Sequence, residues 1–159
     1  VEREDEETWS SFTILPAEQL EITTLFDFGA SVIGKQYAHL DALTDFEQEI
    51  APSRTFAFLH ELEALVDAGL IKGGELDNAL VFVNEVPENG ELAALAQKLN
   101  VQADIAVERE GILNTTQLRF QNEAARHKLL DLVGDLALTG LDLRLKIIAR
   151  KPGHTANTS

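Results

Sequence analysis

The chain has 159 residues, 45% of them hydrophobic, which is enough to bury the core of one domain or of two small ones. Its formal net charge of −14 excludes nucleic acid as a general partner, because the phosphate backbone would be repelled over most of the surface. The absence of cysteine excludes disulfides and thiolate metal sites, so His, Asp and Glu are the candidate metal ligands.

The sequence also bears on location. No apolar run is long enough to cross a bilayer, and the first residues do not form a signal sequence. We therefore expect a cytoplasmic protein without a transmembrane segment. The chain starts at Val1 and contains no methionine, so we expect a trimmed product or part of a longer protein.

The first stretch of the chain favours strands. Residues 1–8 are almost all charged, which predicts a linking segment, although they would enter a strand if paired. Segments 9–15 and 20–28 are rich in β-branched and aromatic residues and flank a turn at Pro16. We predict that these two segments form a hairpin.

The middle of the chain mixes strands and helices. A short helix at 45–50 is expected to be capped by Thr44 and to end before Pro52. A longer helix at 60–70 ends at Gly69. The remaining expectations are strands at 36–41, 53–58, 79–83 and 104–107, a turn at Gly73 and Gly74, and a helix at 89–99.

One amphipathic helix at 120–136 is the element around which we expect the chain to be organised. Asn122 is its expected cap, and an apolar face of Leu129, Leu132, Val133 and Leu136 is expected to join a core. Gly140 ends the helix, and residues 141–150 form a last strand. The pattern predicts an α+β fold with helices covering one face of the strands.

The opposite face of this helix carries a polar stripe. His127, Asp131 and Asp135 recur at i, i+4 steps, and we expect Gly134 to avoid crowding beneath them. An imidazole and a carboxylate one turn apart suit zinc or a related divalent metal. The alternative is a solvated i, i+4 pair, and two residues alone do not complete a catalytic zinc site.

A histidine near the C-terminus is a second candidate. His154 follows the turn Pro152-Gly153, so the backbone would hold it exposed, as a general acid or base must be. The alternative is a histidine in a polar tail. An anionic ligand would need a local basic patch, for which the candidates are Arg126, Lys128, Arg144, Lys146, Arg150 and Lys151.

Three stretches, in order along the chain, resemble one family. They are SRTFAFLHELEALVDAGLIKGGELDNALVFV at 53–83, HKLLDLVGD at 127–135 and PGH at 152–154. The chain resembles the C-terminal domain of UDP-3-O-acyl-N-acetylglucosamine deacetylase, the zinc amidase of lipid A synthesis in Gram-negative bacteria. The longer segment between 82 and 114 is similar to Bacteroidetes-type members, some of which are fused to a 3-hydroxyacyl dehydratase.

The resemblance implies a domain organisation. It implies a two-layer sandwich of a mostly antiparallel sheet packed on helices, with a βαβ insertion at about 54–84 that encloses a fatty acyl chain. Residues 12–157 would be the C-terminal deacetylase domain. Residues 1–11 would be a linker or first strand arriving from an absent N-terminal domain, and 158–159 a tail.

The resemblance also implies roles for individual residues. His127 and Asp131 would be zinc ligands, and Lys128 would help hold the substrate or its developing charge. Asp135 would orient the catalytic His154, which protonates the leaving amine. Thr55 would lie beside the oxygen of the tetrahedral intermediate. The implied substrate contacts are Phe28, near the sugar nucleotide, and Phe56, Phe58, Leu62, Ile71, Gly74 and Ala79 around the acyl chain.

The implied reaction is zinc-dependent hydrolysis of the acetamide of UDP-3-O-acyl-N-acetylglucosamine, in lipopolysaccharide and lipid metabolism. In the family, an N-terminal domain supplies the third zinc ligand and a glutamate general base, and no segment here matches it. The pair His60-Glu61 has the reverse order and is better explained as an exposed helix face. We therefore expect half of an active site, inactive without the N-terminal domain. The alternative is a non-catalytic acyl or sugar-nucleotide binding module.

Overall fold

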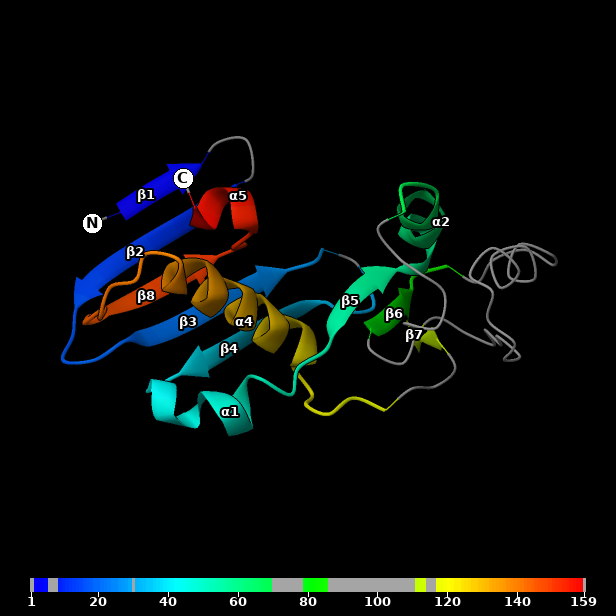
Figure 1. Cartoon of the computed structure of the whole chain (residues 1–159). Coiled ribbons are helices and arrows are strands. Elements are labelled where there is room, and N and C mark those ends of the chain that lie inside the picture. Colours follow the sequence, from blue (N-terminus) through cyan, green and yellow to red (C-terminus); the bar gives the residue numbers. More distant parts are fainter. Residues whose placement is uncertain are drawn as a thin grey trace. The chain divides into compact units, whose positions relative to one another are not determined.

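Figure 1 shows a computed structural model, which describes residues 2–5, 9–29, 31–69, 79–85, 111–113 and 117–158. The described residues form two compact units. The first lies within 1–29, 34–53 and 119–159, and the second within 30–33 and 54–118. The domain boundaries expected from the sequence stay predictions.

The first unit is built on a five-stranded sheet. Its strands, in spatial order, are β1 (Glu2–Asp5), β2 (Ser10–Pro16), β8 (Leu145–Arg150), β3 (Glu21–Asp27) and β4 (Lys35–Leu40). Neighbours are antiparallel except β3 and β8, which are parallel. Because Glu2 pairs with Thr13, part of the charged first segment is a strand and not simply a linking segment.

The predicted hairpin of residues 9–15 and 20–28 is wrong. Both segments are strands, but β8 lies between them and pairs with each. Strand β8 supplies the buried residues Ile147 and Ala149 to the core. In its central position, both edges of β8 are paired with neighbouring strands and one of its faces is buried. A turn after Pro16 allows a hairpin but does not require its two strands to be neighbours.

One face of this sheet is covered by α4 (Glu123–Ala137), which packs against β3 and β4 (Figure 1). A short helix, α5 (His154–Asn157), contacts α4. The core between sheet and helix comprises Leu20, Ile22, Ala38, Leu40, Ile50, Ala125, Leu129, Leu132, Ile147 and Ala149. The predicted α+β class, the helix and its apolar face are therefore confirmed.

Truncating the buried Leu129 is expected to destabilise the first unit. Leu129 has no exposed surface, so Leu129→Ala should lower the free energy of unfolding by about 2–5 kcal/mol. Leu138, just beyond the end of α4, is 80% exposed, and Leu138→Ala should change this free energy by less than about 0.5 kcal/mol. Urea unfolding of the full-length protein that carries this chain measures both, and equal effects would contradict the packing.

The side-chain caps predicted for two helices are wrong. Asn122 is at the N-cap of α4 but makes no side-chain cap bond; its Oδ1 accepts from Arg126 Nε at 2.9 Å. The first turn is satisfied differently, since Gln36 Oε1 accepts from Ala125 N at 3.3 Å. Thr44 lies inside a 3-10 turn, η1 (Leu43–Asp45), which precedes the short helix α1 (Phe46–Glu49).

The second unit contains the predicted βαβ arrangement. Strand β5 (Thr55–Phe58) is followed by α2 (Leu59–Asp67) and by β6 (Ala79–Val83), which pairs with β5 in parallel. Strand β7 (Gly111–Ile112) pairs antiparallel with β6. The elements predicted at 73–74, 89–99 and 104–107 lie outside the described residues. Among the helices that the structure describes, none has the length and apolar character to cross a bilayer.

Candidate active site

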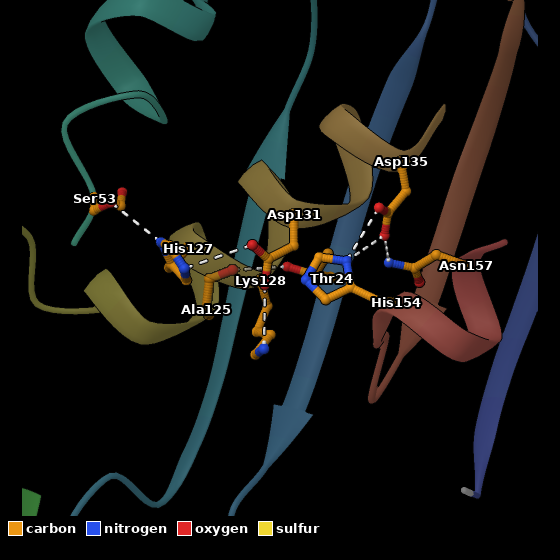
Figure 2. Close-up of polar contacts among 9 residues, drawn as sticks. All are labelled: Thr24, Ser53, Ala125, His127, Lys128, Asp131, Asp135, His154 and Asn157. Atoms are coloured by element: carbon orange, nitrogen blue, oxygen red, sulfur yellow. Dashed lines mark hydrogen bonds and ion pairs between the residues drawn. The ribbon is translucent and has the colours of Figure 1, made fainter. Parts of the chain in front are cut away.

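His127 lies on the polar face of α4 and is held by the backbone of another segment. Its Nδ1 lies 3.2 Å from the carbonyl oxygen of Ser53 (Figure 2). A carbonyl oxygen only accepts hydrogen bonds, so Nδ1 carries the proton and Nε2, on the side of Asp131, would be the ligand atom for a metal. A metal-binding histidine is normally oriented by this kind of contact on its other ring nitrogen.

The Ser53 carbonyl is itself fixed. Ser53 is only 6% exposed, and its N–H donates to the carbonyl oxygen of Ile50 at 3.0 Å. The preceding carbonyl, of Pro52, accepts from Arg119 Nη1 at 2.6 Å. Two hydrogen bonds therefore fix the turn before β5. The carbonyl oxygen that contacts His127 is held in place by them.

The geometry of His127 and Asp131 fits a shared metal ion. Nε2 and Oδ1 are 3.5 Å apart, longer than an ordinary N–H···O hydrogen bond of about 2.7–3.2 Å. Two donors bound tetrahedrally to zinc at about 2.0–2.2 Å are separated by about 3.4 Å. Both side chains are largely buried, at 16% and 13% exposed. Lys128 Nζ donates to the other oxygen, Oδ2, at 3.2 Å.

Two ligands are all that this face provides. Within the described ranges, no group of three His, Asp or Glu side chains could hold a metal ion. The crowding predicted at Gly134 is not found: a Cβ there would meet no described atom within 4 Å apart from its chain neighbours and the nearby helix backbone, so alanine would also fit.

Asp135 and His154 form the second pair. His154 Nδ1 lies 3.0 and 2.9 Å from the two carboxylate oxygens of Asp135, so Nδ1 carries a proton that the carboxylate accepts. The His154 side chain is 69% exposed, whereas that of Asp135 is 12% exposed. A carboxylate behind an exposed imidazole fixes the orientation of the ring, which suits a general acid.

Helix α4 carries the carboxylate of each pair on the same face. Asp131 and Asp135 are four residues apart, about 6 Å along the axis. The helix is attached to the sheet beneath by buried Thr24, whose Oγ1 donates to the carbonyl oxygen of Ala125 at 3.2 Å (Figure 2). The sequence reasoning missed Ser53, Thr24 and Asn157 as residues that support this face.

Phe28 lies just beyond β3 in the first unit. Its ring stacks on Phe26 with centroids 4.4 Å apart, and its N–H donates to the carbonyl oxygen of Gly34 at 3.1 Å. The neighbouring Asp27 accepts from the N–H of Gly29 at 2.9 Å, and this bond, aided by Lys35, holds the pKa of the Asp27 carboxyl below its usual value. Local contacts therefore hold Phe28 and the neighbouring Asp27 and Gly29 in place.

The other residues implied by the resemblance belong to the second unit. Thr55 begins β5 and is exposed. Phe56 and Phe58 lie near Phe82, with ring centroids 6.1 and 6.4 Å from it. Leu62 is buried in a cluster with Val81, Val83 and Leu113, and Ala79 begins β6. Ile71 and Gly74 lie outside the described residues, while His60 and Glu61 are exposed on α2, as expected.

Several of the candidate basic residues are paired with carboxylates. Arg126 pairs with Glu49 at 2.8 Å and lies over the Phe120 ring, 4.2 Å from its centroid. Lys146 pairs with Glu21 at 3.1 Å. Lys128 pairs with Asp131, as described above, and Arg144 forms an exposed pair with Asp142 at 3.6 Å. Arg150 and Lys151 are exposed at the end of β8.

Comparison with known proteins places these residues in a family context. The family model described as LpxC, UDP-3-O-acyl N-acetylglycosamine deacetylase, matches residues 1–94 and 85–159. The bifunctional enzyme LpxC/FabZ of Bacteroides thetaiotaomicron is 42% identical over 157 residues, 99% of this chain and 34% of the relative. The protein of the same name from Chlorobaculum tepidum is 43% identical over 145 residues, 90% of this chain and 31% of the relative.

A relative that is named only as a deacetylase has a similar level of identity. The UDP-3-O-acyl-N-acetylglucosamine deacetylase of Chlamydia pneumoniae is 40% identical over 144 residues, which is 89% of this chain and 42% of that protein. The chain thus spans about a third to two fifths of the length of these curated relatives.

Proposed function

The chain belongs to the UDP-3-O-acyl-N-acetylglucosamine deacetylase family, and we propose that it forms the C-terminal half of a zinc-dependent active site. The proposed reaction hydrolyses the acetamide of UDP-3-O-acyl-N-acetylglucosamine in the cytoplasm, as a step of lipid A synthesis. The observation that carries the proposal is the pair of contacts along α4, His127 toward Asp131 and Asp135 toward His154. These four residues are among those to which the resemblance gives a role.

His127 Nε2 and Asp131 Oδ1 would hold the metal, since their separation fits two zinc ligands. Zinc would supply Lewis-acid activation of a water molecule and of the amide carbonyl. Because the part of the chain that the structure describes offers no third ligand, we propose that an N-terminal domain supplies that ligand and the general base.

The chain's own residues would stabilise the negative charge that develops on the carbonyl oxygen and would donate one proton to the leaving amine. Lys128, beside Asp131, would place a positive charge near the reacting carbonyl. His154, held by Asp135, would donate a proton to the nitrogen as the C–N bond breaks. The water oxygen goes to the acyl carbon, its proton goes to the general base, and acetate and the free amine leave.

The second unit would enclose the fatty acyl chain, with Phe56 and Phe58 of β5 among the contacts. Each buried methylene contributes about 0.8 kcal/mol, so shortening the acyl chain by one methylene should raise KM about fourfold. In Phe58→Ala this dependence should weaken. Steady-state kinetics on substrates of graded acyl length tests it, and equal KM values for all lengths would contradict acyl binding by this unit.

A non-catalytic binding module is the second candidate, because no group of three side chains in the described ranges could hold a metal ion, and no segment of the sequence matches the one that carries the family's general base. The deciding experiment measures intact mass, zinc content and acetate release for the full-length protein that carries this chain. About one zinc per active site together with acetate release supports the deacetylase. Substrate binding without zinc or acetate release supports the binding module.

A further inference from the structure

The one-turn helix α5 presents two side chains to the same carboxylate. His154 Nδ1 contacts both oxygens of Asp135, and Asn157 Nδ2 donates to Oδ2 at 2.7 Å (Figure 2). His154 and Asn157 are three residues apart, so they share one face of this turn. The Asp135 carboxylate therefore accepts hydrogen bonds from two side chains of α5.

The orientation of the Asn157 amide is determined by Asp135. A carboxylate oxygen accepts only, so the amide must turn its NH2 group toward it. Its carbonyl oxygen, Oδ1, is then buried and has no hydrogen-bond partner among the described residues. A buried acceptor without a donor is unfavourable, so the contact with Asp135 outweighs this cost.

Helix α5 is also held by backbone and packing contacts that do not involve the side-chain amide of Asn157. Asn157 N–H donates to the carbonyl oxygen of Gly153 at 2.8 Å, and Thr158 contacts the carbonyl oxygen of His154 through both N–H and Oγ1, at 3.1 and 2.7 Å. Ala156 is buried beneath the turn at 6% exposed. The side chain of Asn157 is thus free to serve Asp135 and is not required to close the helix.

We propose that Asn157 is a positioning residue, which acts on His154 through Asp135; this rests on the proposed function. His154 is 69% exposed, so packing does little to fix its ring, and Asp135 is its anchor. The Asn157 bond to Oδ2 stops the carboxylate from rotating about its Cβ–Cγ bond. The ring then keeps Nδ1 toward α4 and Nε2 toward the amine that receives the proton.

The test compares Asn157→Ala with Thr158→Ala in the full-length protein that carries this chain. Thr158→Ala removes a side-chain bond of the same turn without touching Asp135. Asn157→Ala should lower kcat about 10-fold with KM within about twofold, because misplacing a catalytic group costs rate and not substrate binding. Thr158→Ala should leave kcat within about twofold. Asn157→Asp, which replaces the donor by a second carboxylate, should lower kcat at least as much as alanine.

A double-mutant cycle separates action through Asp135 from a general effect on folding. In an Asp135→Ala background, Asn157→Ala should change kcat by less than about twofold, because the partner is gone. A further 10-fold loss in that background would overturn the proposal, as would wild-type kcat in Asn157→Ala itself.

A second readout does not depend on activity. In proton NMR, the Nδ1 proton of His154 should exchange with water about tenfold faster in Asn157→Ala than in wild type or Thr158→Ala, since opening of the hydrogen bond sets this rate. Equal exchange rates would overturn the positioning role even if the protein proved inactive. Absence of turnover in the wild type, with the exchange difference intact, would instead count against the proposed function alone.

Discussion

Replacing His127 by alanine in the full-length protein that carries this chain is expected to remove its zinc and its deacetylase activity. Nε2 of His127 lies 3.5 Å from Asp131 Oδ1, the spacing of two ligands on one ion. Loss of a residue that only supports a ligand costs about 10–100-fold in metal affinity, so loss of the ligand should cost at least about 100-fold. Zinc content after dialysis and acetate release measure the two effects.

His39→Ala is the matched control for this experiment. His39 also contacts a carboxylate, with Nε2 2.8 Å from Asp41 Oδ1, and its Nδ1 contacts Thr23 Oγ1 at 2.8 Å. It belongs to β4 and is remote in sequence from the α4 stripe, so zinc and activity should be unchanged. If His127→Ala kept both zinc and turnover, the deacetylase proposal would be abandoned.

Unfolding separates metal loss from damage to the fold. With a chelator present, wild type and His127→Ala should differ by about 1 kcal/mol, the typical value of one hydrogen bond. With free zinc at about a thousand times its Kd, the wild type should gain about 4 kcal/mol and the variant much less. A variant that is already destabilised with chelator by several kcal/mol would indicate a structural role.

The sequence predicts α4 well because the pattern of a helix depends on residues that are close together in the sequence. Its period places Leu129 and Leu132 on one face and His127 and Asp131 on the other whatever the rest of the chain does, and the structure shows both faces so disposed. The exposure of His154 after Pro152-Gly153 follows from equally local features. The residues proposed to carry the chemistry could therefore be predicted from short stretches of sequence.

The contacts that hold those residues come from far along the chain and could not be read in the same way. The Ser53 carbonyl is 74 positions from His127, and Thr24 is 101 from Ala125. Alternation of apolar residues tells which face of a strand is buried but not which strand is its neighbour. This is why the insertion of β8 between β2 and β3 was missed.

Caps were mispredicted for a related reason. Asn122 has the residue type of an N-cap, yet its side chain binds Arg126 Nε and the carbonyl oxygen of Tyr37. The first turn of α4 meets Gln36 on β4, so tertiary contacts replace the local bond. Glu123, buried at the start of α4, accepts from the N–H of Arg119 at 2.7 Å and ties the incoming chain.

Replacing His154 by alanine is expected to lower kcat by about 100-fold to 10,000-fold, the usual contribution of a general acid or base. Zinc content should stay at the wild-type level, because His154 contacts Asp135 and not the His127–Asp131 pair. The measurement is kcat and KM for acetate release beside the metal content of the same sample. His127→Ala and His154→Ala should thus both lose activity, but only the first should lose metal.

Exposure of His154 offers a sharper version of this experiment. Because the side chain is 69% exposed, the space it leaves in His154→Ala opens to solvent, and a small proton donor such as imidazolium can enter it. Added imidazole should restore part of kcat in proportion to its concentration, and it should not restore activity to His127→Ala, which lacks metal. Loss of zinc from His154→Ala would instead make this histidine a ligand, and a wild-type kcat would remove it from the proton transfer altogether.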